Sequence, residues 1–146
     1  MAASKPPSSP AGRASAFIEA FNALDVEGMA DCFAVPSVIL DGLAPHVWSG
    51  PTAPRDWCRD ALAEAAHLGA SDFEIVLGEP THNTITGDAA YFVAPAAMRF
   101  KAHAQSITQH GATLTLGLSR VDNDWLIAAW TWTKGSGRGV GDLASK

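Results

Sequence analysis

The sequence predicts an α+β domain in which a curved antiparallel sheet of about four long strands, plus short ones, wraps around three N-terminal helices. Apolar residues recur at helical spacing in the first half of the chain, whereas from residue 71 onward they alternate with polar residues as in strands. Tight turns separate the later strands, so neighbouring strands must be antiparallel. Long twisted strands with helices on one face tend to curl around them, which predicts a cone-shaped pocket.

Composition and motifs exclude several classes of function. The 146 residues fit one domain, and the net charge of −5 comes without any basic cluster, so we expect no nucleic-acid partner. Cys32 and Cys58 stand alone, with no C-x-x-C pair, and the histidines lack metal-ligand spacing. No glycine-rich phosphate loop or G-x-S-x-G motif is present. We therefore expect neither a cofactor nor a metal.

The two ends of the chain differ in composition from its centre. Residues 1–12 are rich in Ala, Ser and Pro and lack the apolar segment of a secretory signal, and no run of 18 apolar residues occurs. Four glycines fall within the seven residues that begin at Gly135. We expect a disordered tail over 1–12, a folded domain over 13–134, a flexible tail over 135–146, and a cytoplasmic protein without membrane contact.

Three helices are predicted in the first half of the chain. Phe17, Phe21 and their apolar neighbours form a stripe at helical spacing over residues 13–24. Asp25 is a typical N-cap for a short helix over 26–33. The clearest helix covers 51–68, with Trp57 on its apolar stripe and Gly69 as its C-terminal residue.

The remaining segments predict strands. A β-branched run at 38–40 and a short extended segment at 46–48 precede the long helix. Turns are expected at 87–88 and 122–124, and a break at 105–111. The expected later strands are 71–77, 81–86, 89–101, 112–121 and 125–133.

This order of elements resembles the nuclear transport factor 2-like superfamily, which includes ketosteroid isomerase and SnoaL-type polyketide cyclases. The resemblance covers about residues 14–134, and it rests on the four segments 17–33, 48–50, 87–89 and 124–127. It implies a cystatin-like α+β cone with a hydrophobic pocket. These segments specify the fold and not the function, because this fold hosts many activities.

The resemblance to ketosteroid isomerase also implies roles for individual residues. An ungapped match of residues 17–41 places the isomerase's general base on Asp41 and its oxyanion-donating tyrosine on Phe17, which has no hydroxyl. The second oxyanion donor falls near Gly117, which has no side-chain donor. Steroid isomerisation by that mechanism is therefore not expected, since losing the oxyanion donors would cost several kcal/mol of catalysis.

Three residues are candidates for acid–base chemistry. Asp41 follows an apolar strand and precedes Gly42, so a desolvated carboxylate there could accept a proton at the pocket mouth, although an Asp before Gly is also typical of a turn. His46 could act beside Trp48, or it could be a loop histidine next to a core tryptophan. His103 lies near the end of a strand that could line the cavity, or it could be a half-exposed sheet residue.

The last strand offers two faces for the pocket. Strict alternation places Trp130 and Trp132 on one face and Thr131 and Thr133 on the other. We expect the threonines to face the pocket and the tryptophans to form a homodimer interface on the outer face of the sheet, while the reverse, an aromatic-walled pocket, stays open. The expected ligand-binding residues are Phe17, Phe21, Trp48, Trp57, Ser119, Thr131 and Thr133.

Two classes of function follow. The first is an enzyme, a cofactor-free isomerase, cyclase or dehydratase that acts on a small apolar molecule, with Asp41 as general base and His46 or His103 assisting. The second is a non-catalytic dimeric module that binds an apolar ligand or a partner protein.

Overall fold

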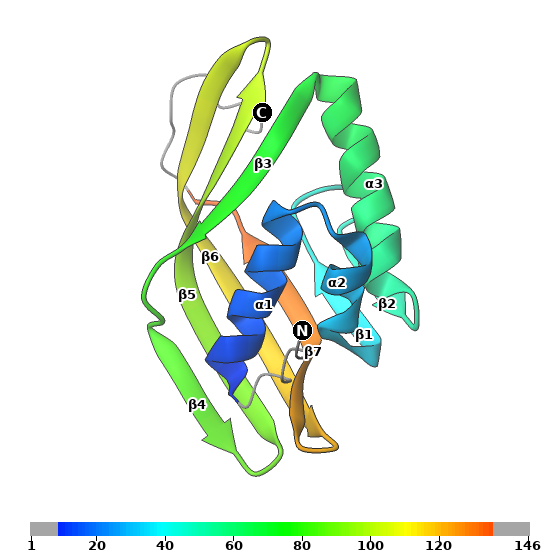
Figure 1. Ribbon diagram of the computed structural model, residues 1–146, viewed down its shortest axis with the longest axis vertical. Coiled ribbons are helices and arrows are strands. Elements are labelled where there is room, and N and C mark those ends of the chain that lie inside the picture. The colour runs from blue at the N-terminus through cyan, green and yellow to red at the C-terminus, as the bar shows by residue number, and fades with distance from the viewer. Residues whose placement is uncertain (1–8, 136–146) are drawn as a thin grey trace, which may run out of the picture.

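The computed structural model describes residues 9–135, in which three helices pack on one face of a seven-stranded sheet (Figure 1). Most of residues 1–12 and 135–146, the two expected tails, lie outside the described residues. The helices are α1 (Pro10–Asn22), α2 (Val26–Asp31) and α3 (Ala53–Leu68). The strands are β1 (Phe33–Leu40), β2 (Val47–Gly50), β3 (Ala70–Leu77), β4 (His82–Thr86), β5 (Ala89–Ala102), β6 (Gln105–Val121) and β7 (Asp124–Thr133).

Capping residues define the ends of the helices. Helix α1 begins at Pro10 rather than at residue 13, because Ser9 accepts a hydrogen bond from the Gly12 amide and proline suits the first turn. Asp25 caps α2 as expected, and Gly69 ends α3 with a φ of 70°. Within residues 9–135, no helix combines the length and the apolar character that crossing a membrane requires.

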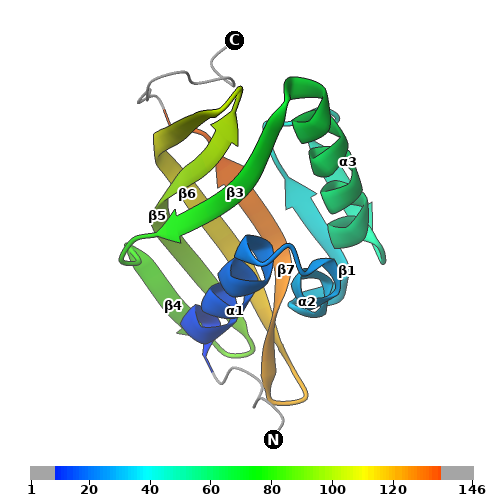
Figure 2. The same ribbon diagram turned by 45° about the horizontal axis from the view of Figure 1, so that its top comes forward.

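The sheet is mixed rather than wholly antiparallel. Its order is β2-β1-β7-β6-β5-β3, with β4 also paired to β5, and the pair β1–β7 is parallel. A long stretch of chain separates β1 from β7, so no tight turn forces these two strands to be antiparallel. The sheet curves around α1 and leaves α3 beside β1 and β3 (Figure 2).

The hairpin of β5 and β6 is longer than the sequence indicates. The expected break at residues 105–111 is wrong, because β6 starts at Gln105 and pairs with β5 from Ala102 onward. His103 and Ala104 form the turn with φ angles of 53° and 67°. Such left-handed two-residue turns normally carry Asn or Gly, so the sequence gives no sign of this one.

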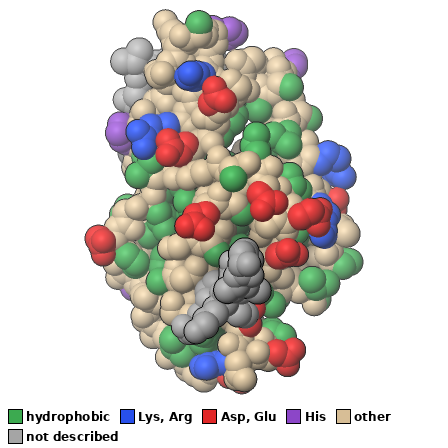
Figure 3. Space-filling view, viewed as in Figure 1, with side chains coloured by type: hydrophobic (Ala, Val, Ile, Leu, Met, Phe, Trp, Pro, Cys, Tyr) green, Lys and Arg blue, Asp and Glu red, His purple; other side chains and the backbone are tan. Residues whose placement is uncertain are grey.

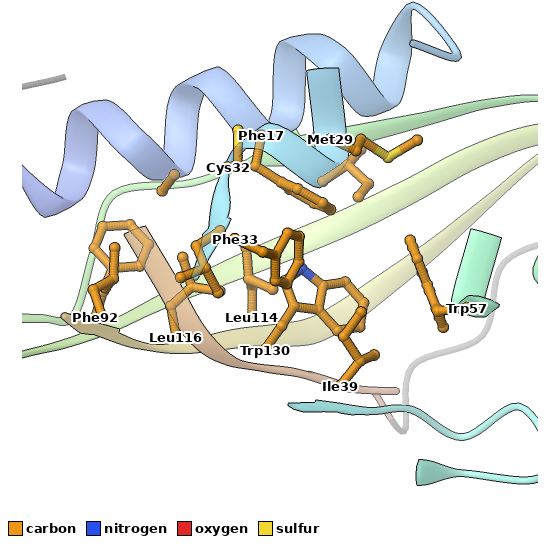
Figure 4. Close-up of a cluster of buried hydrophobic side chains, with 14 of the residues drawn as sticks. Phe17, Met29, Cys32, Phe33, Ile39, Trp57, Phe92, Leu114, Leu116 and Trp130 are labelled. Carbon is orange, nitrogen blue, oxygen red and sulfur yellow. The ribbon is translucent and has the colours of Figure 1, made fainter. Parts of the chain in front are cut away.

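The main core lies between α1 and the concave face of the sheet (Figure 4). Phe17 of α1 is fully buried and packs against Phe33 and Trp130, with ring centroids 5.8 Å apart in both pairs. Leu114 and Leu116 of β6 are also fully buried beneath it. This packing places the concave face of β7 under the helices.

A buried ion pair attaches the start of α1 to β7. Arg13 is only 7% exposed, and its Nη2 lies 2.8 Å from Asp124 Oδ1. Arg13 Nε also donates to the Trp125 carbonyl at 2.6 Å. These contacts connect residues more than one hundred positions apart and fix α1 across the sheet.

Candidate functional site

A cavity of about 170 Å³ lies between α3, β3 and the end of β7. Its walls are almost wholly apolar, and hydrophobic side chains gather at the surface between α3 and β3 (Figure 3). Leu24 and Leu62, which are 61% and 46% exposed, belong to both the lining and the surface. The lining consists of Phe21, Leu24, Met29, Asp41, Trp57, Cys58, Ala61, Leu62, Ala65, Phe73, Ile75, Met98, Trp130 and Trp132.

Asp41 contributes the one carboxyl group among these described lining residues. It directly follows β1, and its Oδ1 accepts a hydrogen bond of 2.7 Å from the Gly42 amide. Its Oδ2 accepts a hydrogen bond of 2.9 Å from Trp57 Nε1. Both carboxylate oxygens are therefore held in place at the wall of the cavity.

Burial controls the protonation of Asp41. Desolvation raises the pKa of this carboxyl above its ordinary value of 3.8, and it outweighs the hydrogen bonds from Trp57 and the Gly42 and Leu43 amides and the proximity of His46, which act in the opposite direction. A carboxylate with a raised pKa is a stronger base than a solvated one. The side chain can therefore accept a proton from a ligand and hold it.

Helix α3 brings Trp57 to this carboxyl. Trp57 lies on the inward stripe of the helix together with Cys58 and Ala61, as the helical spacing predicts. Its indole is 5% exposed and lies 4.9 Å, centroid to centroid, from that of Trp130 on β7 (Figure 4). One end of the indole thus holds Asp41 while its rings form part of the wall.

The expectation that Trp130 and Trp132 lie on the outer face of the sheet is wrong. Both line the cavity, and Trp130 is only 2% exposed. The reason is a β-bulge, because Gly117 pairs with Ala129 whereas Leu118 pairs with Ile127, so Ala128 has no residue opposite it. One extra residue reverses the alternation, which moves the later tryptophans to the concave face.

The same bulge moves the threonines away from the cavity. Thr131 and Thr133 alternate with Trp130 and Trp132, so they occupy the opposite face, and neither lines the cavity. Ser119 follows the inward Leu118 on β6 and is also absent from the lining. The predicted pocket contacts of these three side chains are not made. The homodimer stays a prediction, and the outer sheet face on which it is expected does not carry the two tryptophans.

Besides Trp57, the three other aromatic candidates from the first half of the chain occupy different places. Phe21 lines the cavity, whereas Phe17 is fully buried in the core behind it. Trp48 is buried on β2, and its Nε1 donates to Asp60 Oδ2 at 2.8 Å. Trp48 therefore attaches β2 to α3 and is not among the residues that line the cavity.

The two histidine candidates are exposed and lie outside the cavity lining. The His46 Nδ1 atom is 3.1 Å from the main-chain oxygen of Asp41, so the ring contacts the loop rather than the carboxyl. His103 lies in the β5–β6 turn, close to Gly69 at the end of α3. The His46 ring therefore lies beside the Asp41 main chain, but neither histidine is among the residues that line the cavity.

Several lining residues are not predicted from the sequence. Phe73 and Ile75 come from β3, and Met98 comes from β5 opposite Ile75. A sequence pattern marks these residues as strand residues, but only the pairing of distant strands brings them to α3. Within residues 9–135, no three His, Cys, Asp or Glu side chains gather as a metal site would require.

Comparisons with solved structures identify the same architecture in other proteins. A protein of unknown function from Mycobacterium tuberculosis is 18% identical, with a TM-score of 0.70 over 85% of this chain and 68% of that one. A ketosteroid isomerase-like protein from Erwinia carotovora atroseptica is 14% identical, with a TM-score of 0.68 over 87% of this chain and 94% of that one. At these identities, the likeness shows the fold alone.

A further solved structure shares the fold, and a family model matches the sequence. An NTF2-like protein with a cystatin-like fold from Novosphingobium aromaticivorans is 13% identical, with a TM-score of 0.68 over 86% of this chain and 79% of that one. No curated protein matches the sequence. The model of the SnoaL-like domain family matches residues 13–131, which is most of the chain. The chain therefore belongs to the SnoaL-like domain family.

Proposed function

We propose that the protein binds a small, largely apolar molecule in the cavity and that Asp41 exchanges a proton with it, in a cofactor-free isomerase, cyclase or dehydratase reaction. The observation that carries this proposal is the position of the Asp41 carboxyl, oriented by Trp57 in an otherwise apolar wall. Asymmetric sites of this kind, with one polar group in a hydrophobic pocket, are typical of small-molecule sites. The ketosteroid isomerase-like neighbour supports proton-transfer chemistry as one use of this fold.

The chemistry begins with the Asp41 carboxylate. It removes a proton from a carbon next to a carbonyl group, and the electron pair of the C–H bond moves to give an enolate. Returning the proton to another carbon of the conjugated system completes an isomerisation. Alternatively, the enolate expels a β-hydroxyl group. That group takes up the proton from Asp41 and leaves as water, which completes a dehydration. Neither route needs an oxidant or a reductant.

The lining restricts which substrates can react. The two positions that match the isomerase's oxyanion donors, Phe17 and Gly117, have no side-chain donor, and none of the described lining residues carries a hydroxyl group. Apart from indole N–H groups, of which that of Trp130 is buried without a hydrogen-bond partner, the lining therefore offers little stabilisation to a developing oxyanion. We expect turnover only of substrates whose own conjugation spreads the negative charge.

Solvent deuterium exchange tests the proposal without knowledge of the natural substrate. The protein is incubated in D₂O with acetophenone or ethyl benzoylacetate, and loss of the α-proton signal is followed by NMR. The wild type should accelerate exchange over buffer, and Asp41→Asn should abolish the acceleration. Asp60→Asn is the matched control, because Asp60 also accepts an indole hydrogen bond but is not among the cavity-lining residues.

The non-catalytic alternative gives a different result in the same experiment. If these ketones bind and shift the melting temperature but exchange no faster than in buffer, the cavity is a binding site alone. If exchange is accelerated equally in the wild type and in Asp41→Asn, the proton transfer lies elsewhere. Either outcome would overturn the role of Asp41 as a base.

A further inference from the structure

The size of the cavity limits the ligand. We infer that the ligand is a neutral, single-ring aromatic molecule that presents one hydrogen-bond donor to Asp41, as a phenol does; this inference rests on the proposed function. An apolar cavity of about 150 Å³ is enough to hold benzene. The cavity here is of similar size, about 170 Å³, so it has room for one ring with a small substituent and not for a fused four-ring skeleton.

The walls favour a flat aromatic ring over an aliphatic chain. Aromatic side chains and the thioethers of Met29 and Met98 dominate the lining. Aromatic rings gain attraction from edge-to-face and offset contacts, and thioether sulfur also contacts ring edges favourably. The aromatic side chains of the lining are Phe21, Trp57, Phe73, Trp130 and Trp132.

Asp41, the polar end of the cavity, determines which functional group the ligand must carry. The Asp41 carboxylate already accepts hydrogen bonds from Trp57 and from the Gly42 and Leu43 amides, and a carboxylate has about four acceptor positions in all. The capacity that remains can accept one hydrogen bond from a ligand hydroxyl group. No Lys or Arg is among the described lining residues, so an aromatic carboxylate would meet a like charge without compensation.

A neutral donor fits this environment better than a cation does. An ammonium group would have to leave water to pair with Asp41 in a largely apolar cavity, and that desolvation offsets much of the charge attraction. A phenol group loses far less hydration. Leu24 and Leu62 belong to the lining and are exposed, so a ligand would enter past these two apolar side chains.

Calorimetric titration of the full chain with four probes tests the donor, the charge and the size of the ligand separately. The probes are p-cresol, toluene, benzylamine and estrone, a steroid that carries a phenol ring. We expect p-cresol to bind at least about tenfold more tightly than toluene, which is the effect of one hydrogen bond to a charged acceptor. Benzylamine should bind more weakly than p-cresol because its ammonium group must be desolvated. Estrone should bind more weakly because its four rings exceed the size of the cavity.

Two variants of α3 locate the binding. Ala61 lines the cavity, so Ala61→Phe should fill it and abolish p-cresol binding while the helix still forms. Ala63→Phe is the control, because Ala63 is exposed on the same helix, and it should leave the affinity unchanged. Unfolding curves confirm that both variants are folded. Unchanged p-cresol binding in Ala61→Phe would place the site elsewhere.

The outcomes distinguish this inference from the function on which it rests. Tighter binding of estrone than of p-cresol would overturn the size limit and leave the proposed function intact. Tighter binding of benzylamine would overturn the neutral donor and identify a cation site. Equal affinities for toluene and p-cresol would show that Asp41 takes no part in recognition. The absence of binding by every probe, with accelerated exchange of the ketones retained, would overturn the phenol-type ligand and leave the proposed function intact.

Discussion

Trp57 Nε1 donates a hydrogen bond of 2.9 Å to Asp41 Oδ2, and this contact joins helix α3 to the end of β1 at the cavity. A second indole–carboxylate pair, Trp48 with Asp60, joins β2 to the same helix. The two carboxyls behave differently. Burial raises the pKa of Asp41, whereas the hydrogen bonds from Trp48 and Arg59 lower the pKa of the half-buried Asp60.

Removing the donor on Trp57 should raise the pKa of Asp41 further. Trp57→Phe keeps an aromatic ring in the wall but removes a hydrogen bond that favours the charged carboxylate. The acid limb of the pH dependence of ketone exchange should move to higher pH. Trp48→Phe, which removes the equivalent bond to Asp60, should leave that limb in place; equal movement in both variants would contradict the positioning role of Trp57.

Neutralising Asp41 should change how stability depends on pH. The pKa of Asp41 in the folded state lies above 3.8, so the folded protein favours the neutral form, and stability is lost as pH rises from about 3.8 through the folded-state pKa. Asp41→Asn cannot ionise and avoids that loss. The free energy of unfolding of the variant relative to the wild type, from urea titrations, should therefore increase between about pH 3.5 and about pH 7. A difference that stays constant with pH would contradict this linkage.

Breaking the ion pair of α1 should destabilise the fold without acting on the cavity. Arg13→Met removes the bonds to Asp124 and to the Trp125 carbonyl, and it should lower the free energy of unfolding by about 2–3 kcal/mol. Urea unfolding measures this loss. Lys101→Met, which removes an exposed ion pair with Asp72, is the control and should cost about 0–1 kcal/mol. Similar costs for the two variants would show that Arg13 does not anchor the helix.

The cysteine in the cavity should be chemically inert. Burial raises the pKa of the Cys58 thiol to about 11, so only about one molecule in a thousand carries the reactive thiolate at about pH 8. Burial also raises the pKa of Cys32. Alkylation by iodoacetamide, followed by intact mass, should be slow in the native protein and rapid in urea. Rapid labelling of native Cys58 would show that the cavity wall opens readily.

The sequence predicts the parts of this site that depend on local patterns. The helical spacing around Trp57 identifies the inward face of α3, and the resemblance to ketosteroid isomerase identifies Asp41. The structure places both at the cavity, although the role of Asp41 as a base stays a prediction. These residues are predictable because a helix period or an ungapped segment does not depend on the rest of the chain.

The rest depends on pairing between distant strands. The bulge at Ala128 reverses the faces of β7, and no residue type in that segment signals it. Similarly, Met98 reaches the cavity only because it pairs with Ile75, and the His103 turn lacks the usual Asn or Gly. A one-residue change of register therefore decides between a threonine-lined and a tryptophan-lined pocket.

The most direct test of the account is an NMR titration of the Asp41 carboxyl carbon in the ligand-free protein, with Asp41→Asn used to assign the signal. The proton-transfer proposal needs a carboxyl that is desolvated in the cavity wall, so it predicts a pKa above 3.8. A pKa at or below 3.8 would contradict the account, because it would mean that water or hydrogen bonds stabilise the charge and that Asp41 is no stronger a base than an ordinary surface aspartate.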